Sequence, residues 1–308
     1  MTNSFADLSP RAACEALRSA DLLCSPEQIE IERRDERWAV FLPGERIAWF
    51  PASDLGSRRL ALERRVLRLV GQRCSFQVPR PLWMSHSGID VRQMVPGRCD
   101  PATLFQRCQI DVALARRVGE AIGAMLAQQH TRITADDVGQ WLPRRVRWPE
   151  RAEWIRERLP AVTDDRDLLH RIDEVIDRYD AVTVDPADLV LVQGDVGLHN
   201  VALDPHTDAI NGMFDYDGAA WADRHHDFRY LRFDVGRDDM LDAACRVYEA
   251  AVNRSIDRAR VDLYNAMCAI SYLAYRNGIP PEREWCGRTL AGDLAWVRDA
   301  IARLDFSA

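Results

Sequence analysis

The stretch "LVQGDVGLHNVALD", residues 191–204, holds a carboxylate in a loop between two apolar runs. The runs, at 189–192 and 201–203, are short and rich in Val and Leu, which predicts two strands. Asp195 stands in the loop between them, and Asn200 ends the loop five residues later. Because strands bury apolar surface, polar side chains at this place predict a bound partner.

Two more carboxylates follow the next apolar run. After a turn at "DPHTD", the segment "AINGMFDYDG" predicts another strand, which ends on Asp215 and Asp217. The chain therefore gathers three aspartates and one asparagine at the ends of short strands.

The composition indicates a globular protein and excludes several classes. Of the 308 residues, 47% are apolar and 29% charged, and no apolar run approaches the ~20 residues of a membrane helix. The net charge of −7 argues against a nucleic-acid partner. Eight scattered cysteines and an N-terminus without a signal pattern predict a cytoplasmic protein with no membrane partner. All 41 basic residues are arginine, and the chain has no lysine.

Residues 1–95 read as a β-rich unit with one inserted helix. Ser9 and Pro10 have the N-cap and first-turn chemistry of a helix, and five strands are predicted from 29 to 95. The inserted helix, over 56–72, has an apolar stripe through Leu60, Leu67 and Val70, and Glu63 lies on that stripe.

From residue 96 the pattern changes to mostly helical. "PGR" at 96–98 is typical of a hinge, and helices are predicted within 111–130, 148–159, 166–182, 238–255, 260–278 and 290–304. The prediction is an α+β protein with a small β-rich lobe, 1–95, and a larger helical lobe, 96–308. A cleft between the lobes would hold the substrate.

The loop "GDVGLHN", followed by "MFDYDGAAWADRHHDFRYL", resembles the aminoglycoside phosphotransferase family, which has the protein-kinase-like fold and includes choline kinase and antibiotic kinases as relatives. The resemblance extends to "LALERRVLRLV…VPRPLW" and to "VRQMVPGR", so it covers most of the chain. It implies a two-lobed kinase-like fold, with the nucleotide bound by the N-terminal lobe. It also implies ATP or GTP as co-substrate and Mg²⁺ as cofactor.

The resemblance assigns roles to individual residues. Phosphoryl transfer needs a carboxylate to orient the acceptor hydroxyl and a cation on the phosphates, and Mg²⁺ prefers a few oxygen ligands. The implied residues are Asp195 as catalytic base, Asn200 and Asp215 as Mg²⁺ ligands, Gln93 and Val95 as hinge positions holding the base, Asp217 toward a second cation or the substrate, Asp227 holding the loop, and Gln193 in place of the family's histidine.

The segments predicted to bind the nucleotide depart from the family's sequence pattern. The strand that would carry the family's lysine reads "RIAWFPAS", with Trp49 nearest to that place. A buried Glu63 requires a cation, and the nearest arginine on that strand predicts Arg46 as its partner or as a phosphate contact. The segment "ERRDERWAV" has no glycine for a phosphate-covering loop, and Arg33, Arg34 or Arg37 could supply charge instead.

Three functions follow from these patterns. The first is a kinase that transfers the terminal phosphate of ATP or GTP to a hydroxyl of a small molecule, possible acceptors being aminoglycosides or other amine-bearing compounds. The second is a catalytically inert kinase-like binding or regulatory protein, suggested by the missing lysine and glycine loop. The third is a two-metal hydrolase built on Asp195, Asp215 and Asp217, which the two-lobed organisation disfavours.

Overall fold

The N-terminal part is one antiparallel sheet of five strands in the order β1-β2-β3-β5-β4. The computed structural model describes residues 5–233 and 238–305. Its first five strands are β1 (Glu30–Arg34), β2 (Arg37–Leu42), β3 (Arg46–Pro51), β4 (Arg80–Met84) and β5 (Asp90–Gln93). All five predicted strands are present.

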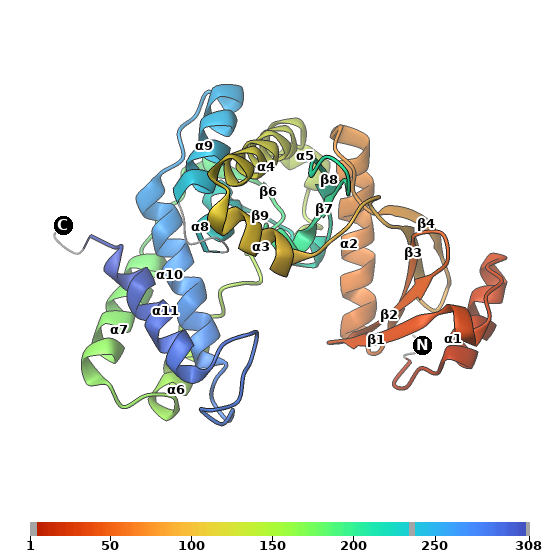
Figure 1. Cartoon of the computed structure of the whole chain (residues 1–308), viewed down its shortest axis with the longest axis horizontal. Helices are drawn as coiled ribbons and strands as arrows, with labels where there is room; N and C mark the ends of the chain where they lie inside the picture. The colour runs from red at the N-terminus through yellow and green to blue at the C-terminus, as the bar shows by residue number, and fades with distance from the viewer. Residues whose placement is uncertain (1–4, 234–237, 306–308) are drawn as a thin grey trace.

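The two faces of the sheet pack against different helices. Val40 and Phe50 lie in the core beneath α1 (Pro10–Leu17), whose N-cap is Ser9 as predicted. Ala39 and Trp49 face the other way and pack with Leu60 of the second helix. Figure 1 shows α1 on the outer side of the sheet, away from the helical part of the molecule. The period-2 alternation of strands thus gives this small sheet two buried faces.

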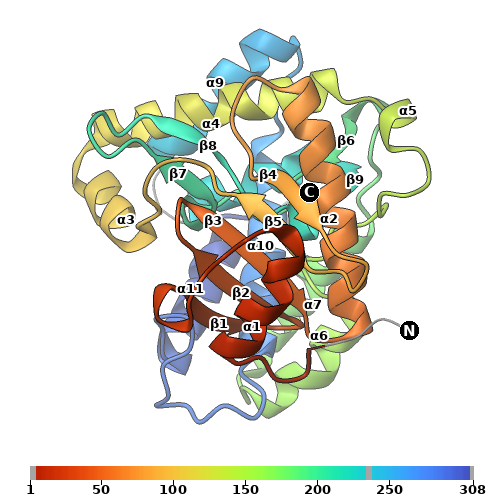
Figure 2. The same ribbon diagram turned by 90° about the vertical axis from the view of Figure 1, so that its right-hand side faces the viewer.

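Helix α2 (Asp54–Arg73) stands between the sheet and the helical part (Figure 1), and Figure 2 shows it running beside the strands. The predicted stripe is buried: Leu60 is in the core of the sheet, and Leu67 and Val70 are in the core of the C-terminal part. Glu63 lies between them on the same helix and is 2% exposed. The helix therefore brings one carboxylate to the boundary between the two parts.

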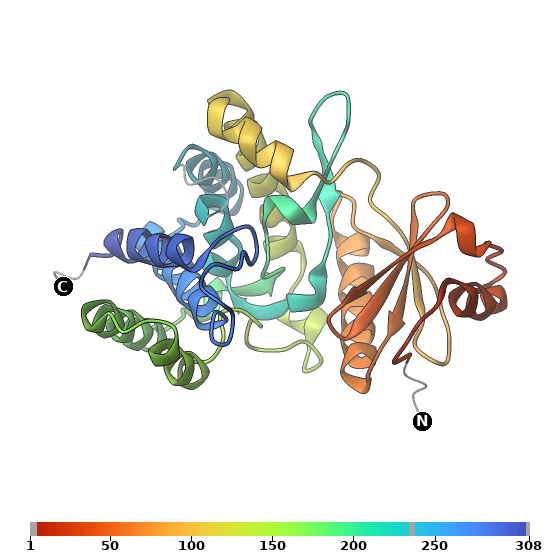
Figure 3. The same ribbon diagram turned by 60° about the horizontal axis from the view of Figure 1, so that its bottom comes forward.

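The C-terminal part contains two large hydrophobic cores. In Figure 3 its light green and dark blue helices lie together on the side of the molecule away from the sheet. Its helices are α3 (Pro101–Ile110), α4 (Val112–Arg132), α5 (Ala135–Val138), α6 (Ala152–Arg158), α7 (Arg166–Asp180), α8 (Arg229–Phe233), α9 (Asp238–Val252), α10 (Arg258–Ala274) and α11 (Leu290–Ala302). Six of these were predicted, whereas α3, α5 and α8 were not. The lobe boundary predicted at 95 and 96 falls between β5 and α3.

Two small ribbons carry the predicted aspartate cluster. Strand β6 (Leu189–Val192) pairs with β9 (Ala220–Asp223), and β7 (Val201–Leu203) pairs with β8 (Ile210–Met213). Strand β9 was not predicted. The loop between β6 and β7 consequently links two different ribbons rather than closing one hairpin.

No helix in the described ranges has both the length and the apolar character needed to cross a membrane.

A buried histidine makes the stability of the fold depend on pH. His226 stacks on Tyr264, with ring centroids 4.2 Å apart, and its Nδ1 lies 3.1 Å from Nη1 of Arg229. Burial, together with the charge of Arg229, holds the pKa of His226 well below its usual value. At acidic pH the unfolded chain therefore binds a proton that the folded chain does not.

We expect the free energy of unfolding to fall as the pH drops below about 6.5, by up to about 1.4 kcal/mol per pH unit from this one group. Urea unfolding at pH 7.5 and 5.5 measures the change. His226→Asn, which cannot titrate, should lose less stability between the two pH values than the parent protein. Equal losses in both proteins would contradict this assignment.

Candidate active site

A buried aspartate holds the loop between β6 and β7. Asp227 accepts hydrogen bonds from the backbone N–H groups of Gln193 and Gly194, at 3.1 and 2.8 Å. Its Oδ2 also lies 3.0 Å from Nε2 of His130 on α4. The loop contacts predicted for Asp227 are thus present, and the helix behind the loop fixes the carboxylate that makes them.

Gln193 joins the loop to the strand end that carries Asp215. Its Nε2 donates to the carbonyl oxygens of Phe214 and Asp215, at 3.0 and 2.8 Å, and its Oε1 accepts from the N–H of Asp195 at 2.6 Å. Gly194 has φ of +87°, and a Cβ there would lie 3.0 Å from the carbonyl oxygen of Gly218. A glycine is therefore needed at 194, and a glutamine at 193 uses both ends of its amide.

The carboxylate of Asp195 is ordered by its neighbours in the loop. Oδ2 accepts from Nδ2 of Asn200 at 3.0 Å and lies 3.2 Å from Nε2 of His199. Burial alone would raise the pKa of Asp195, but the hydrogen bond and charge of His199, with the charge of Arg229, hold it below the usual value. The group is therefore ionised at neutral pH and can accept a hydrogen bond from an acceptor hydroxyl.

Asn200 and Asp215 have the donor atoms that a cation would need. Nδ2 of Asn200 donates to both the backbone and the side chain of Asp195, so the amide oxygen is the group turned to other partners. Asp215 has φ of 60° and ψ of 65°, a left-handed conformation that re-aims its side chain at the end of β8. To bind one ion, Asn200 and Asp215 must face the same space. Asp195 connects them, because it accepts a hydrogen bond from Asn200 and its charge lies near Asp215.

The charge around Asp215 fits a divalent cation. Burial, with the carboxylates of Glu63, Asp217 and Asp195 nearby, raises the pKa of Asp215 to about 6 despite the opposing effect of Arg37. Oδ1 of Asp217 is buried and has no hydrogen-bond partner among the described residues. Several close carboxylates, one of which has a buried oxygen without a hydrogen-bond donor, favour a bound cation.

Mg²⁺ suits this donor set. Within residues 5–233 and 238–305, no group of three His, Cys, Asp or Glu side chains is arranged to hold a metal. Mg²⁺ does not require one, because it binds through one or two protein oxygens together with water and phosphate oxygens. The two adjacent histidines are engaged elsewhere: His225 with Asp223, at 2.5 Å, and His226 with Tyr264.

Glu63 is held by two arginines, neither of which is Arg46. Its Oε2 lies 3.0 Å from Nη1 of Arg37 on β2 and 2.9 Å from Nη1 of Arg92 on β5. Although burial alone would raise the pKa of Glu63, Arg92 and Arg37 hold it below the usual value. Glu63 has the arginine partners that its burial required, but the prediction of Arg46 as that partner was wrong, and a phosphate contact by Arg46 stays a prediction.

Arg46 lies at the far end of β3. Its Nε donates to the carbonyl oxygen of Pro43 at 2.9 Å, and its partner on β5 is Gln93. It is therefore beside the hinge rather than beside the helix carboxylate. The face of the sheet that reaches Glu63 is occupied by Arg37 and Trp49, whose ring centroid is 4.5 Å from the guanidinium carbon of Arg37.

The predicted hinge positions lie at the end of β5 and just after it. Gln93 ends the strand, and its Nε2 donates to the carbonyl oxygens of Gly44 and Glu45 at 3.1 and 2.9 Å. The side chain of Val95 is buried. Gln93 thus fixes the strand end to the β2–β3 turn, and the base-binding role of both positions stays a prediction.

A cavity of about 680 Å³ contains Asp195, Asp215 and Asp217 together with Arg37. One wall is aromatic and is made of Trp148, Tyr230, Tyr272, Tyr275 and Trp285. The cavity also includes residues from β1 and the turn after it, namely Glu32, Arg33, Arg34 and Asp35. It is therefore bounded both by the sheet and by the helical part.

The aromatic wall is built from ring contacts. Tyr275 stacks with Trp148 and with Trp285, at centroid distances of 5.3 and 5.8 Å. The hydroxyl of Tyr275 donates to Oε1 of Glu150 at 2.6 Å. These residues were not predicted as site residues, because aromatic side chains spread over 148–285 have no local sequence signal.

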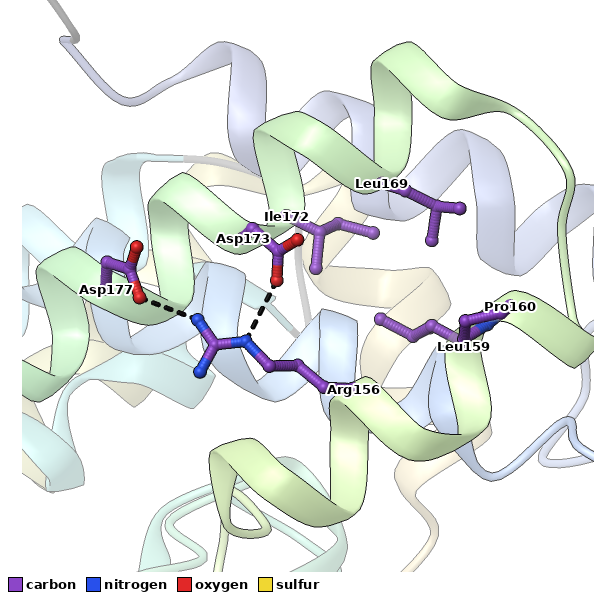
Figure 4. A pocket seen from close by; sticks show the side chains of 7 residues that line it. All are labelled: Arg156, Leu159, Pro160, Leu169, Ile172, Asp173 and Asp177. Carbon is purple, nitrogen blue, oxygen red and sulfur yellow. Dashed lines mark hydrogen bonds and ion pairs between the residues drawn. The ribbon is translucent and has the colours of Figure 1, made fainter.

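A second cavity, of about 450 Å³, lies between α6 and α7 (Figure 4). Arg156 spans it and is paired with Asp173 and Asp177, at 2.9 and 2.6 Å. The charged side chains of this cavity therefore form ion pairs with one another, and none of the predicted site residues lines the cavity.

Comparisons with known proteins agree with this architecture. The structure resembles the GDP complex of aminoglycoside 2'-phosphotransferase-IIIa, with TM-score 0.70, 15% identity, and coverage of 95% of this chain and 97% of that one. It resembles a macrolide 2'-phosphotransferase type I, with TM-score 0.64, 17% identity and 97% of each chain covered. It also resembles a choline/ethanolamine kinase family protein from Mesorhizobium loti, with TM-score 0.58, 16% identity, and coverage of 89% and 86%.

At these identities the likeness establishes the kinase-like fold, as predicted. No curated protein sequence matches the chain. Residues 31–264, however, match the family model described as the phosphotransferase enzyme family, APH. The match includes the helix glutamate, the hinge, the aspartate loop and both strand-end aspartates, and the chain belongs to this phosphotransferase family.

Proposed function

We propose that this protein is a Mg²⁺-dependent kinase that moves the terminal phosphate of ATP or GTP to a hydroxyl of a small molecule. The observation that carries the proposal is one cavity in which an ionised Asp195, the carboxylates of Asp215 and Asp217, and the guanidinium of Arg37 meet. A base, a cation site and a phosphate-facing positive charge are the parts that phosphoryl transfer requires. Because ATP and GTP are nucleotides of the cell interior, we infer that the protein acts in the cytoplasm.

In the proposed reaction, the acceptor hydroxyl hydrogen-bonds to Asp195 in line with the terminal phosphorus. The acceptor oxygen forms a bond to phosphorus, the bond to the nucleoside diphosphate breaks, and the hydroxyl proton passes to Asp195. Asn200 and Asp215 would hold Mg²⁺, which neutralises charge on the phosphates when bound. The hinge at the end of β5, at Gln93 and Val95, would hold the nucleobase.

The aromatic wall supports an amine-bearing acceptor. Ring faces attract a cation placed over them, and Glu150 adds a negative charge at the edge of the same wall. The acceptor would then lie between the wall and Asp195, with its hydroxyl toward the base. Aminoglycosides and smaller amino alcohols both carry the required groups.

A panel of amine-bearing antibiotics and small amino alcohols tests the proposal. Release of nucleoside diphosphate from ATP or GTP should depend on both Mg²⁺ and one acceptor class, and the acceptor should gain the mass of one phosphoryl group. Consumption of neither nucleotide with any acceptor would count against the proposal. Matched incubations without protein control for spontaneous hydrolysis.

Asp215→Ala is expected to remove most of the Mg²⁺-dependent affinity for nucleotide, and Asn200→Ala should act in the same direction more weakly. A carboxylate offers a charge and two oxygens, whereas an amide offers one neutral oxygen. Calorimetric titration with and without Mg²⁺ measures the difference. Metal-dependent affinity that survives in Asp215→Ala would show that this residue is not a ligand.

The inert binding protein remains the alternative that the missing lysine suggested. Neither the family match nor the structural neighbours support it. The positive charge whose absence motivated it is present in the cavity, on Arg37.

A further inference from the structure

Arg37 is the cation that links the helix carboxylate to the aspartates of the cavity. The residue is 8% exposed and begins β2. Its Nη1 lies 3.0 Å from Oε2 of Glu63, while its Nη2 lies 3.4 Å from Oδ1 of Asp215 and 3.5 Å from Oδ2 of Asp217. One half of the guanidinium thus faces the helix and the other half faces the cavity.

The strand register explains how β2 delivers a charge to this place. Ala39 is opposite Trp49 and Arg37 is opposite Pro51, so Arg37 and Trp49 are diagonal neighbours on one face of the sheet. The guanidinium carbon is 4.5 Å from the centroid of the Trp49 ring. The long side chain at 37 therefore lies over the ring at 49 and ends beside Glu63, the helix carboxylate that faces this side of the sheet.

Glu63 would be neutralised even without the charge of Arg37. Arg92, which is 1% exposed, already contacts the same carboxylate oxygen at 2.9 Å, and the other carboxylate beside Arg92, that of Asp90, has its own arginine in Arg64. A purely structural ion pair would be complete with Arg92. Arg37 adds a second positive charge, and this one faces the cavity.

Resting on the proposed function, we propose that Arg37 is the phosphate-binding residue of the nucleotide site, supplied by β2 because the chain has no lysine on β3. In the complex, one edge of the guanidinium fork stays on Glu63 and the other donates to phosphate oxygens. The present contacts with Asp215 and Asp217 are exchanged for that phosphate. Arginine is suited to this because its planar fork can bind two oxyanions at once.

Titration of nucleotide into Arg37→Met tests the assignment. Affinity for the nucleoside triphosphate with Mg²⁺ should fall about 10- to 100-fold, the value of a hydrogen bond to a charged group. Affinity for the nucleoside without phosphates should not change, because the lost contact is to phosphate. Arg37→Lys, which keeps the charge but not the fork, should lie between wild type and Arg37→Met.

Arg34→Met is the matched control. Arg34 lines the same cavity and its guanidinium carbon is 5.9 Å from the Trp49 ring, but it is paired with Glu32 at 2.6 Å. It should keep most of the triphosphate affinity. An equal loss in Arg34→Met and Arg37→Met would mean a diffuse electrostatic effect and would overturn the assignment.

Relocating the charge provides a second, independent test. In Arg37→Met combined with Trp49→Lys, the new ammonium starts from the strand position whose ring now lies beneath the guanidinium. Triphosphate affinity should recover relative to Arg37→Met alone. No recovery in a folded double variant, with Arg37→Lys also as weak as Arg37→Met, would overturn the proposal.

The outcomes separate this inference from the proposed function. If the parent protein binds neither ATP nor GTP with Mg²⁺, the proposed function fails. If it binds and Arg37→Met binds equally well, only the role of Arg37 fails. A parallel loss of nucleoside and triphosphate affinity in Arg37→Met would indicate a collapsed site and would also overturn the role.

Discussion

Asp195→Asn is expected to lower the rate of phosphoryl transfer by about 10²–10⁴-fold, the usual contribution of a general base. The amide is nearly the same size as the carboxylate, and its oxygen can still accept the hydrogen bond that Asn200 now donates to Oδ2. It carries no negative charge and cannot take the proton of the acceptor. The loss should therefore fall on kcat, with nucleotide affinity and thermal stability nearly unchanged.

Steady-state rates with a saturating acceptor measure this effect. Asp204→Asn is the matched control, because Asp204 is a half-buried residue nine positions later whose carboxylate caps the turn at 206–207. It should leave the rate unchanged. A rate for Asp195→Asn within a few-fold of the parent would remove Asp195 from its assigned role.

Glu63→Ala is expected to destabilise the fold by about 3–5 kcal/mol, the typical cost of removing one partner from a buried ion pair. The side chain is 2% exposed and is shared by Arg37 and Arg92, at 3.0 and 2.9 Å. Its removal leaves excess positive charge between the sheet and α2. Since Arg37 would also lose one of its anchors, nucleotide affinity should fall as well.

Urea unfolding at neutral pH measures the change in stability. Glu15→Ala is the control, because Glu15 is also a helical glutamate paired with an arginine, but both side chains are more than half exposed. Its cost should be at most about 1 kcal/mol. Similar costs for the two variants would contradict the buried network inferred around Glu63.

The residues of the aspartate loop could be predicted because their signal is local. Asp195, Asn200 and Asp215 stand at fixed distances from short apolar runs, and Glu63 interrupts a helical stripe at a position that helical periodicity must bury. The contacts of Asp227 were accessible through the family resemblance. In each case the relevant pattern spans a few residues of one element.

The partner of Glu63 could not be read from proximity along β3. The pair forms through the register of two strands, which brings Arg37 rather than Arg46 to the face that α2 covers. The position of the turn at Pro43 to Glu45 could have indicated the right residue. It fixes the register of β2 and β3, and that register places Arg37 diagonal to Trp49. The sequence therefore implied an arginine without identifying it.

Strand pairing and the aromatic wall depend on contacts far apart in the chain. The run at 220–223 is short, alanine-rich and fully buried, so it lacks the alternation that marks a strand, and only its pairing with β6 defines it. Trp148 and Trp285 meet through Tyr275 although they are 137 positions apart in the chain, 285 minus 148. By contrast α3 had a usable signal, because Asp100 and Pro101 have the chemistry of a helix start.

Transfer of an isotopically labelled terminal phosphate is the most direct test of the proposed activity. The parent protein, nucleotide labelled in that phosphate, Mg²⁺ and an acceptor from the panel are incubated, and both acceptor and inorganic phosphate are examined by mass spectrometry. We expect the label on the acceptor hydroxyl, dependent on Mg²⁺ and lost in Asp195→Asn. Label found only in inorganic phosphate, or left entirely on the nucleotide with every acceptor, would contradict a phosphotransferase of small molecules.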